Sequence, residues 1–270
     1  LHTFSTASWT GPSRKTLLLN SRAPTSREPS NASITTASAR RIVAVRSLAW
    51  VGSDYLVVHD ALNIDEQILR HWHLQVVADS VSGSSGQYEF QGRFGVDLQV
   101  VLPDQPFTGE LMETVSVLEY HGAPEEWFAM KHLQLTGGNS GGYVAVLKPL
   151  SAKDQEKISA TALGANGIRV CGRTYTDLHW FNREGMEDRQ DGILFRGQYG
   201  ACLQREKREL LWLGGPGEIR DNGMSLESPG PMVLAVAEGH KVTFHANGAG
   251  TIRWNNREVE IPKGMTRLVF

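Results

Sequence analysis

The stretch RRIVAVRSLAWVGSDYLVVHDAL, residues 40–62, contains two β-rich runs separated by a short polar break. Valine, isoleucine and aromatic residues recur in both runs, and residues of these types favour strands. Gly52-Ser53-Asp54 between the runs is a turn signal. The stretch therefore predicts two strands joined by a turn.

The same pattern continues to the end of the chain of 270 residues. Short apolar runs are separated by Gly, Asn, Asp and Pro, and we find no internal repeat, no heptads and no long amphipathic helix. Many short strands at regular spacing are typical of a sandwich or barrel. We therefore predict an all-β fold, a large two-layer antiparallel β-sandwich with its apolar residues on the inner faces.

The domain organisation follows from composition. Residues 1–39 are rich in Ser, Thr, Pro and Arg and form a loop-rich leading segment; residues 40–270 form the sandwich, with a possible sub-boundary near 150–165. Residues 151–164 fit a helix or a charged loop followed by a strand, and alternation in the neighbouring runs favours the second reading. Residues 79–87 are interpreted as a loop, and the glycine-rich residues 136–144 as a hairpin connection.

Composition excludes several classes of function. The net charge is −2 with both signs interspersed, so no basic stripe suits a nucleic acid. No apolar run approaches the ~20 residues of a membrane span. The chain has neither a phosphate-binding loop nor a Gly-x-Ser-x-Gly elbow. Cys171 and Cys202 lie on separate expected strands and are either a disulfide or two buried thiols.

RHWHLQ, residues 70–75, places two histidines in one expected strand. Alternate residues of a strand share a face, so His71 and His73 point one way and Trp72 the other. Such a pair could bind a metal, contact a sugar or simply form hydrogen bonds at the sheet surface. Because two ligands do not hold zinc, a third would have to come from elsewhere, and the candidates are His59, His121 and His132.

Two further positions carry polar or aromatic groups of interest. Asp60 ends an apolar run, where a turn-capping role is favoured over a functional one. If a polar site exists, we expect it on the face of His71 and His73, with Asp60 at the end of the neighbouring strand. In TDLHWFN, residues 176–182, Trp180 is either a core residue or a platform for sugar rings.

The order of several local patterns resembles the β-sandwich module of heparinase II/III-like polysaccharide lyases. Residues 40–62 resemble its Arg-led strand and hairpin, and RHWHLQ is similar to the next strand, which ends in a histidine. YVAVLKP, residues 143–149, resembles the strand that ends in a Leu-x-Pro pattern, and residues 193–219 and 224–237 resemble the closing strands. The order of these motifs, rather than any one of them, carries the resemblance.

The resemblance implies a function shared between two domains. Members cleave uronic-acid polysaccharides by β-elimination, which needs a base at C5, an acid for the leaving oxygen and a neutralised carboxylate. The residues for these tasks lie largely on an N-terminal helical toroid, which these 270 residues do not contain.

We therefore expect a C-terminal lyase portion, secreted or periplasmic, whose catalytic residues are unknown. It would bind acidic polysaccharide and be completed by a helical domain of the same protein or of a second chain. The alternative is a stand-alone carbohydrate-binding or interaction module without catalysis.

The resemblance also makes zinc possible, because many such lyases hold it with two histidines and an aspartate. His73 matches one of these histidines. The other belongs to a His-Asn-Thr run that this sequence lacks. The aspartate would fall shortly before Arg40, but residues 23–39 contain no Asp, and Glu28 is the only acid there. His73 is thus the one metal-ligand candidate, and His71, His73 and Trp180 are the substrate-binding candidates.

Overall fold

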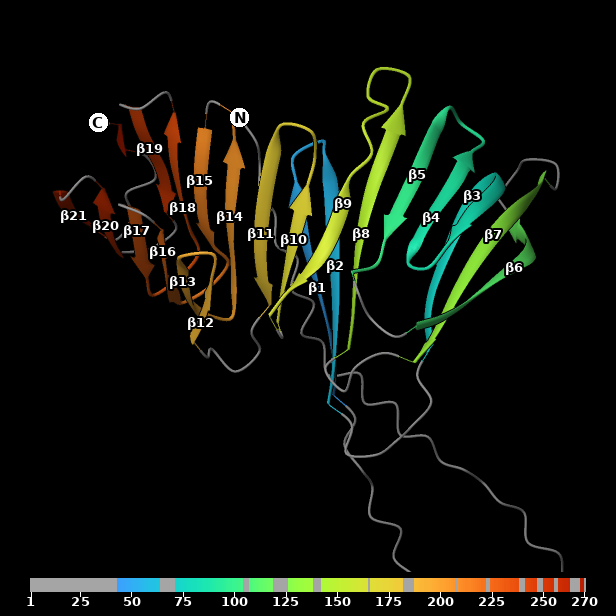
Figure 1. Ribbon diagram of the computed structural model, residues 1–270, viewed down its shortest axis with the longest axis horizontal. Coiled ribbons are helices and arrows are strands. Elements are labelled where there is room, and N and C mark those ends of the chain that lie inside the picture. The colour runs from blue at the N-terminus through green and yellow to red at the C-terminus, as the bar shows by residue number, and fades with distance from the viewer. Residues whose placement is uncertain are drawn as a thin grey trace, which may run out of the picture.

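The structure, a computed structural model, is an array of β-strands (Figure 1). It describes residues 43–63, 71–103, 107–118, 126–137, 142–164, 166–181, 187–206, 208–221, 224–237, 241–246, 250–254, 257–262 and 268–269. Within these ranges every regular element is a strand, the sheets are antiparallel, and no helix has the length and apolar character of a membrane span. The predicted all-β antiparallel sandwich is confirmed.

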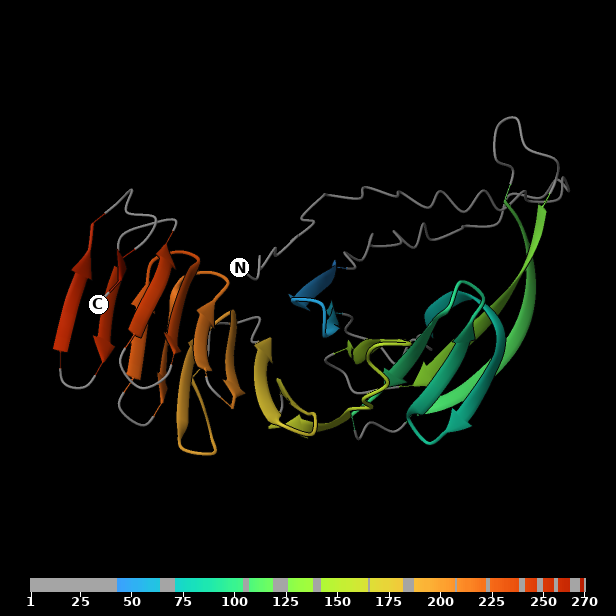
Figure 2. The same ribbon diagram turned by 90° about the horizontal axis from the view of Figure 1, so that it is seen from above.

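The first sheet contains the first eight strands, in the order β1-β2-β8-β5-β4-β3-β7-β6. Figure 2 shows that this sheet is strongly curved. Its strands are β1 (Val43–Val51), β2 (Tyr55–Asn63), β3 (His71–Ser84), β4 (Gln87–Gly92), β5 (Val96–Val101), β6 (Phe107–Leu118), β7 (Glu126–Gly137) and β8 (Gly142–Ser151).

Strand β8 joins the two parts of the first sheet, because it pairs with β2 on one side and with β5 on the other. Gly142 begins β8 opposite Ala61, with a φ of 124°. A Cβ at this position would lie 1.6 Å from the carbonyl oxygen of Asp60. Only glycine therefore allows β8 to approach β2 this closely at its first residue.

The remaining strands form two sheets. The middle sheet has the order β22-β19-β18-β15-β14-β11-β10-β9 and the third sheet the order β12-β13-β16-β17-β20-β21. The strands of the middle sheet are β9 (Ser159–Leu163), β10 (Gly167–Cys171), β11 (Tyr175–Phe181), β14 (Tyr199–Arg205), β15 (Arg208–Leu213), β18 (Met232–Ala237), β19 (Lys241–Ala246) and β22 (Leu268–Val269). Those of the third sheet are β12 (Glu187–Gln190), β13 (Ile193–Gly197), β16 (Gly217–Asp221), β17 (Met224–Ser228), β20 (Gly250–Trp254) and β21 (Arg257–Ile261).

The middle sheet has an apolar core on each face. Leu178 and Trp180 of β11 belong to the core shared with the third sheet, where Trp180 stacks on Phe195 with ring centroids 5.3 Å apart. Phe181, on the other face of β11, belongs to the core shared with the first sheet, together with Val57. The spacing of the strands suggested two layers. The structure adds a third, because apolar residues of the middle sheet alternate onto both faces.

A buried polar cluster connects the first and middle sheets. The Tyr55 hydroxyl of β2 lies 2.5 Å from Asp177 Oδ2 and 2.9 Å from His179 Nε2, both on β11. Arg205 of β14 donates from Nη2 to the same Asp177 oxygen at 2.6 Å, and its Nη1 lies 3.1 Å from Asp54 Oδ2. We call Tyr55, Asp177, His179 and Arg205 the interlayer cluster.

Burial shifts the pKa values of Asp177, His179 and Tyr55 in the directions that favour their neutral forms. Desolvation raises the pKa of Asp177 to about 6, although Arg205 opposes this rise. Desolvation, followed by the charge of Arg205, lowers the pKa of His179 to about 3, so this imidazole is neutral at pH 7. Desolvation, followed by the Asp177 charge, raises the pKa of Tyr55 well above its ordinary value.

The connection from the first to the middle sheet is fixed by side chains of the first. The Gln99 amide donates to the Ile158 carbonyl and accepts from the Ile158 N–H, both at 2.9 Å. Lys148, which is almost fully buried, forms an ion pair with Asp154 in the same connection. The segment is a charged turn followed by the strand Ser159–Leu163, as predicted for residues 151–164.

Two expected loops differ from the structure. Residues 79–87 are largely strand, because β3 continues to Ser84 and turns tightly through Ser85 and Gly86 into β4. Both turn residues have positive φ, 51° and 84°, which suits the twist of a two-residue hairpin. The glycine-rich residues 136–144 do not connect a hairpin: three strands, β5, β4 and β3, lie between β8 and β7.

The interlayer cluster predicts a pH dependence of folding stability. His179 takes up a proton below about pH 6.5 when unfolded but only near pH 3 when folded, so its contribution to stability is lost as pH falls through this window. Asp177 acts in the opposite direction between about pH 6 and 3.8 through a smaller shift. We expect thermal unfolding of His179→Gln to vary less with pH, by up to about 1.4 kcal/mol per pH unit. His71→Gln, at an exposed histidine, is the control, and equal slopes for His179→Gln and the unaltered chain would contradict the assignment.

Candidate functional site

His71 and His73 share one face of β3, as the alternation of a strand predicts. Both are exposed, whereas Trp72 between them is 5% exposed and packs in the core inside the curved first sheet. The expected geometry of the His-x-His pair is therefore confirmed, while its role stays a prediction.

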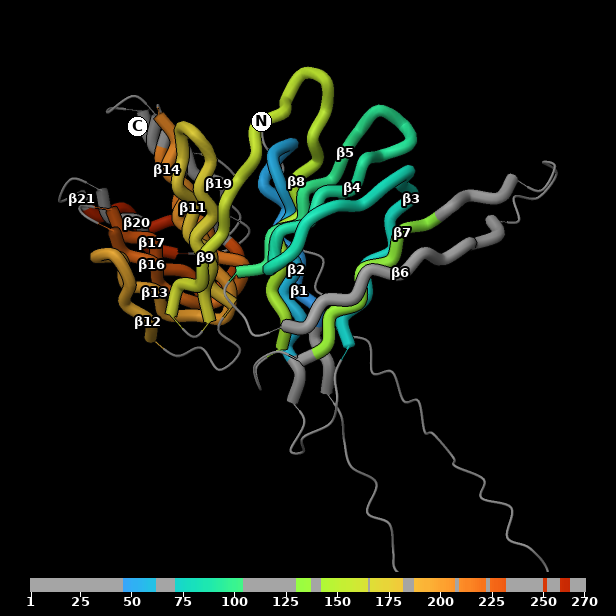
Figure 3. Tube along the Cα trace, turned by 45° about the vertical axis from the view of Figure 1, so that its right-hand side comes forward, coloured from blue at the N-terminus to red at the C-terminus, as the bar shows by residue number. Residues whose placement is uncertain are grey.

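A third histidine joins this pair from the neighbouring strand. β3 and β7 lie side by side (Figure 3), and their register pairs His73 with Gln134 and Gln75 with His132. His132 is thus diagonal to His73, and His73 Nδ1 lies 2.8 Å from His132 Nε2. We call His71, His73 and His132 the histidine face.

Neighbouring polar groups hold His71 in place. The ring centroids of His71 and His73 are 6.0 Å apart, and those of His73 and His132 are 5.0 Å apart. His71 Nδ1 lies 2.9 Å from Thr136 Oγ1 and 3.2 Å from Gln134 Nε2. The rings follow one another along the sheet, so a ligand lying over them would meet imidazole, amide and hydroxyl groups in turn.

The surroundings of His73 favour the neutral form of its imidazole. Desolvation lowers the pKa of His73, and the neighbouring charges of His132 and then His71 lower it further. His132 is 8% exposed, and its Nδ1 has no hydrogen-bond partner among the described residues. In the contact between His73 and His132, one ring donates its N–H to the bare nitrogen of the other, which requires at least one neutral ring.

Asp60 lies elsewhere in the first sheet. Its carboxylate forms two hydrogen bonds with Arg46 of β1, both of 2.6 Å. β8, β5 and β4 separate β2 from β3, so Asp60 is not at the end of a strand next to the histidine face. The expected proximity of Asp60 to the histidine face is wrong, because β2 and β3 follow one another in the sequence but are not neighbours in the sheet. The carboxylate forms a cross-strand ion pair rather than a turn cap.

The other residues considered as sugar or metal contacts are buried or lie outside the residues that the structure describes. Trp180 is 1% exposed in the core between the middle and third sheets, so the core reading holds and the ring cannot stack on a sugar. His59 stacks on Phe181 between the first and middle sheets, with centroids 4.8 Å apart. His121 and Glu28 lie outside the described residues. Cys171 and Cys202 are free thiols.

The described side chains around His73 do not fit zinc. Structural zinc needs four ligands and catalytic zinc three plus water. Among the three histidines of the histidine face, two imidazole nitrogens are in contact with each other, those of His73 and His132. His71 Nδ1 instead contacts the hydroxyl of Thr136 and the amide of Gln134. Within the described residues, three metal-ligating groups come within 4.8 Å of one another at one place, Cys202, Glu209 and Asp221, which sequence reasoning missed.

The interlayer cluster contains the residue types that β-elimination uses, but it is sealed. Tyr55 and His179 are each 1% exposed and Asp177 is 0% exposed. Arg205, one quarter exposed at its side chain, covers the Tyr175 ring at 3.9 Å. A polysaccharide cannot reach the tyrosine and histidine, so this cluster stabilises the packing of two sheets rather than acting on a substrate.

The fold and the histidine face define the chain as an antiparallel β-sandwich protein with an exposed polar strip. No family model and no curated protein matches it. Among solved structures, a mutant of the chondroitin AC lyase of Streptomyces coelicolor A3 is 12% identical with a TM-score of 0.38. The match covers 73% of this chain and 31% of that enzyme, and a likeness of this size assigns neither family nor activity.

The contact between His73 and His132 predicts a change in titration. In His132→Gln, one of the causes that lower the pKa of His73 is removed, so this pKa should rise toward 6.5. Imidazole carbon-bound proton shifts, followed by NMR against pH, measure the change. His71→Gln should have a smaller effect in the same direction, since its charge is the lesser cause. An unchanged His73 titration in His132→Gln would show that the two rings are not in contact in solution.

Proposed function

We propose that this chain is the β-sandwich portion of a polysaccharide lyase-like protein and that its histidine face binds acidic polysaccharide. The observation that carries the proposal is the exposed row of His71 and His73, in contact with Gln134, Thr136 and His132. Amide and hydroxyl groups hydrogen-bond sugar hydroxyls, and protonated imidazoles attract uronate carboxylates. The order of sequence motifs supports the lyase-like assignment.

In this proposal the sandwich binds and the chemistry belongs to another domain. Tyr55 and His179, the tyrosine and histidine of the interlayer cluster, are buried and cannot serve a bound polysaccharide as acid and base. A helical domain, of the same protein or of a second chain, would supply the base, the leaving-group acid and the group that neutralises the carboxylate. A secreted or periplasmic location would bring the protein to its polysaccharide.

A second function remains a candidate: a stand-alone module that binds glycan without any catalysis. The same row of exposed histidines favours it, because binding needs no partner domain. The two functions differ in what happens when the chain meets a helical partner domain. Release of unsaturated uronates by the combined domains supports the lyase-like function, and binding alone supports the stand-alone module.

Binding should become tighter as the pH falls. The pKa of His73 is lowered, so the ring gains its positive charge below about pH 6.5, while the uronate carboxylates stay ionised. We expect affinity for a heparin-type polysaccharide, alginate or glucuronan, measured by calorimetry, to be higher at pH 5.5 than at pH 7.5. His73→Ala should weaken binding at pH 5.5 roughly fivefold, equivalent to about 1 kcal/mol for one exposed charged contact.

Thr161→Ala, at an exposed position of β9 on the middle sheet, is the control for this experiment. It should leave affinity and its pH dependence unchanged. Equal affinities at both pH values, or identical binding by His73→Ala and the unaltered chain, would place the polysaccharide away from the histidine face.

The isolated chain should have little or no lyase activity. β-Elimination needs a base, an acid and a carboxylate-neutralising group within hydrogen-bond reach of one another. The measurement is the absorbance of unsaturated uronates released from the same three polysaccharides. Robust release by this chain alone would show that it carries its own active site. Reducing ends that appear without unsaturated product would indicate a hydrolase instead.

A further inference from the structure

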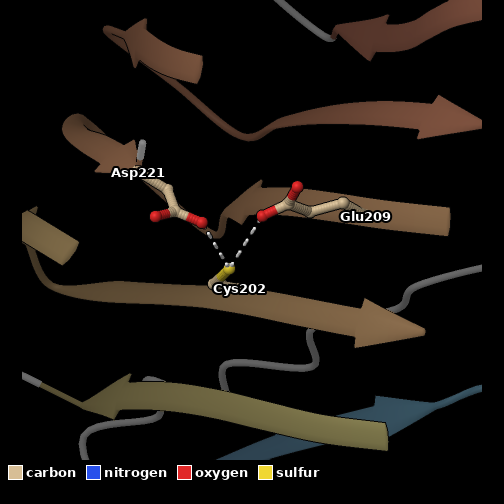
Figure 4. A group of neighbouring side chains, drawn as sticks. All are labelled: Cys202, Glu209 and Asp221. Atoms are coloured by element: carbon tan, nitrogen blue, oxygen red, sulfur yellow. Dashed lines mark hydrogen bonds between the residues drawn. The ribbon is translucent and has the colours of Figure 1, made fainter. Parts of the chain in front are cut away.

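Three side chains that can ligate a metal converge where the middle and third sheets meet (Figure 4). Cys202 comes from β14, Glu209 from β15 and Asp221 from the end of β16. Cys202 Sγ is 3.9 Å from both Glu209 Oε1 and Asp221 Oδ2, and one ligand atom from each residue lies within 4.8 Å of the others. The group combines two paired strands of one sheet with a strand of the facing sheet, so tertiary packing assembles it.

The Cys202 thiol is fully buried and points between the two carboxylates. In the described part of the chain, its polar contacts are those two oxygens and no others. A thiol has a single proton and can donate to only one of two acceptors at a time. Either oxygen therefore satisfies the thiol as a donor, and the thiol cannot serve both oxygens at once, whereas a cation between the three groups would contact all of them.

The surroundings of Glu209 disfavour the charged form of its carboxyl group. Burial, followed by the hydrogen bond and charge of Asp221, raises the pKa of Glu209 to about 7. Asp221 is itself 7% exposed. Gln204, which pairs with Glu209 in the register of β14 and β15, hydrogen-bonds the Glu209 carboxylate and orients it.

We propose that Cys202, Glu209 and Asp221 bind one divalent cation of the zinc class through the thiolate and one oxygen of each carboxylate. Zinc accepts sulfur at about 2.3 Å and oxygen at about 2.0 Å, so tetrahedral ligands stand about 3.5 Å apart, sulfur to oxygen. The present separations of 3.9 Å need only a slight contraction. Glu209 is half-buried, so a water as fourth ligand would approach from the Glu209 side.

Binding exchanges protons for the metal and transfers no electrons. The thiol loses its proton to become a ligand, and the protonated fraction of Glu209 also loses its proton, both to solvent. Burial, followed by the charges of Asp221, Glu209 and Asp177, raises the pKa of the Cys202 thiol in the absence of metal. Metal affinity should therefore rise with pH.

Cobalt(II) provides the test, because a cobalt–thiolate bond gives a charge-transfer absorption in the near ultraviolet. The full chain, first freed of metal with a chelator, is titrated with Co²⁺ and then with competing Zn²⁺. We expect the absorption to saturate at one equivalent and to disappear as zinc displaces cobalt. Cys202→Ser should abolish it, whereas Cys171→Ser, at the half-buried cysteine of β10, should retain it.

Two further variants keep the proposal falsifiable. If Cys202→Ser does not fold, as judged by circular dichroism, the near-isosteric Glu209→Gln should still weaken Co²⁺ binding by roughly 10- to 100-fold. The double variant His73→Ala with His132→Gln should keep the thiolate absorption, which separates this site from the histidine face. Absence of the absorption in the unaltered chain, or an equal absorption in Cys202→Ser, would show that these three groups do not bind the metal.

Discussion

Burial of the middle sheet on both faces is the constraint on which the rest of the structure depends. β11 contributes Leu178 and Trp180 to one core and Phe181 to the other. Its polar side chains are then also buried, so Asp177 and His179 must find partners within the protein. Tyr55, from the first sheet, supplies the hydroxyl that both of them contact. The sheets are therefore joined by a polar contact with a defined geometry as well as by apolar packing.

Local features of this fold could be predicted from the sequence, but features that depend on layer assignment could not. The turn at Gly52-Ser53-Asp54 follows from residue types, and the strand after the charged turn at Ser151 follows from the alternation of the neighbouring runs. The third layer does not follow from the sequence. A strand that places Asp177 and His179 on one face alternates like a half-exposed strand, and this pattern is the same whether or not another sheet covers that face. Order within the first sheet is similarly non-local, and this is why Asp60 lies far from the histidine face.

The candidate sites illustrate the same limit. Alternation places His71 and His73 on one face, but the contact with His132 depends on the register between β3 and β7. Alternation gives no sign that Cys202 faces Asp221, since these residues lie on different sheets. The two sites also differ chemically. On the histidine face the pKa of the exposed His73 is lowered, which favours a neutral ring, whereas at the cysteine site burial and Asp221 raise the pKa of Glu209 and favour its neutral carboxyl group.

The place of β8 in the first sheet has a consequence for how the chain folds. Among the described strands, β8 alone pairs with both β2 and β5, and it begins at Gly142. The β1–β2 hairpin and the strands from β3 to β7 therefore remain two separate pieces, each with an open edge, until synthesis has passed residue 151. Open edges invite pairing with other chains. Contacts that span this much sequence also slow folding. A chain that emerges from the ribosome one residue at a time must keep these edges apart from other strands until β8 arrives.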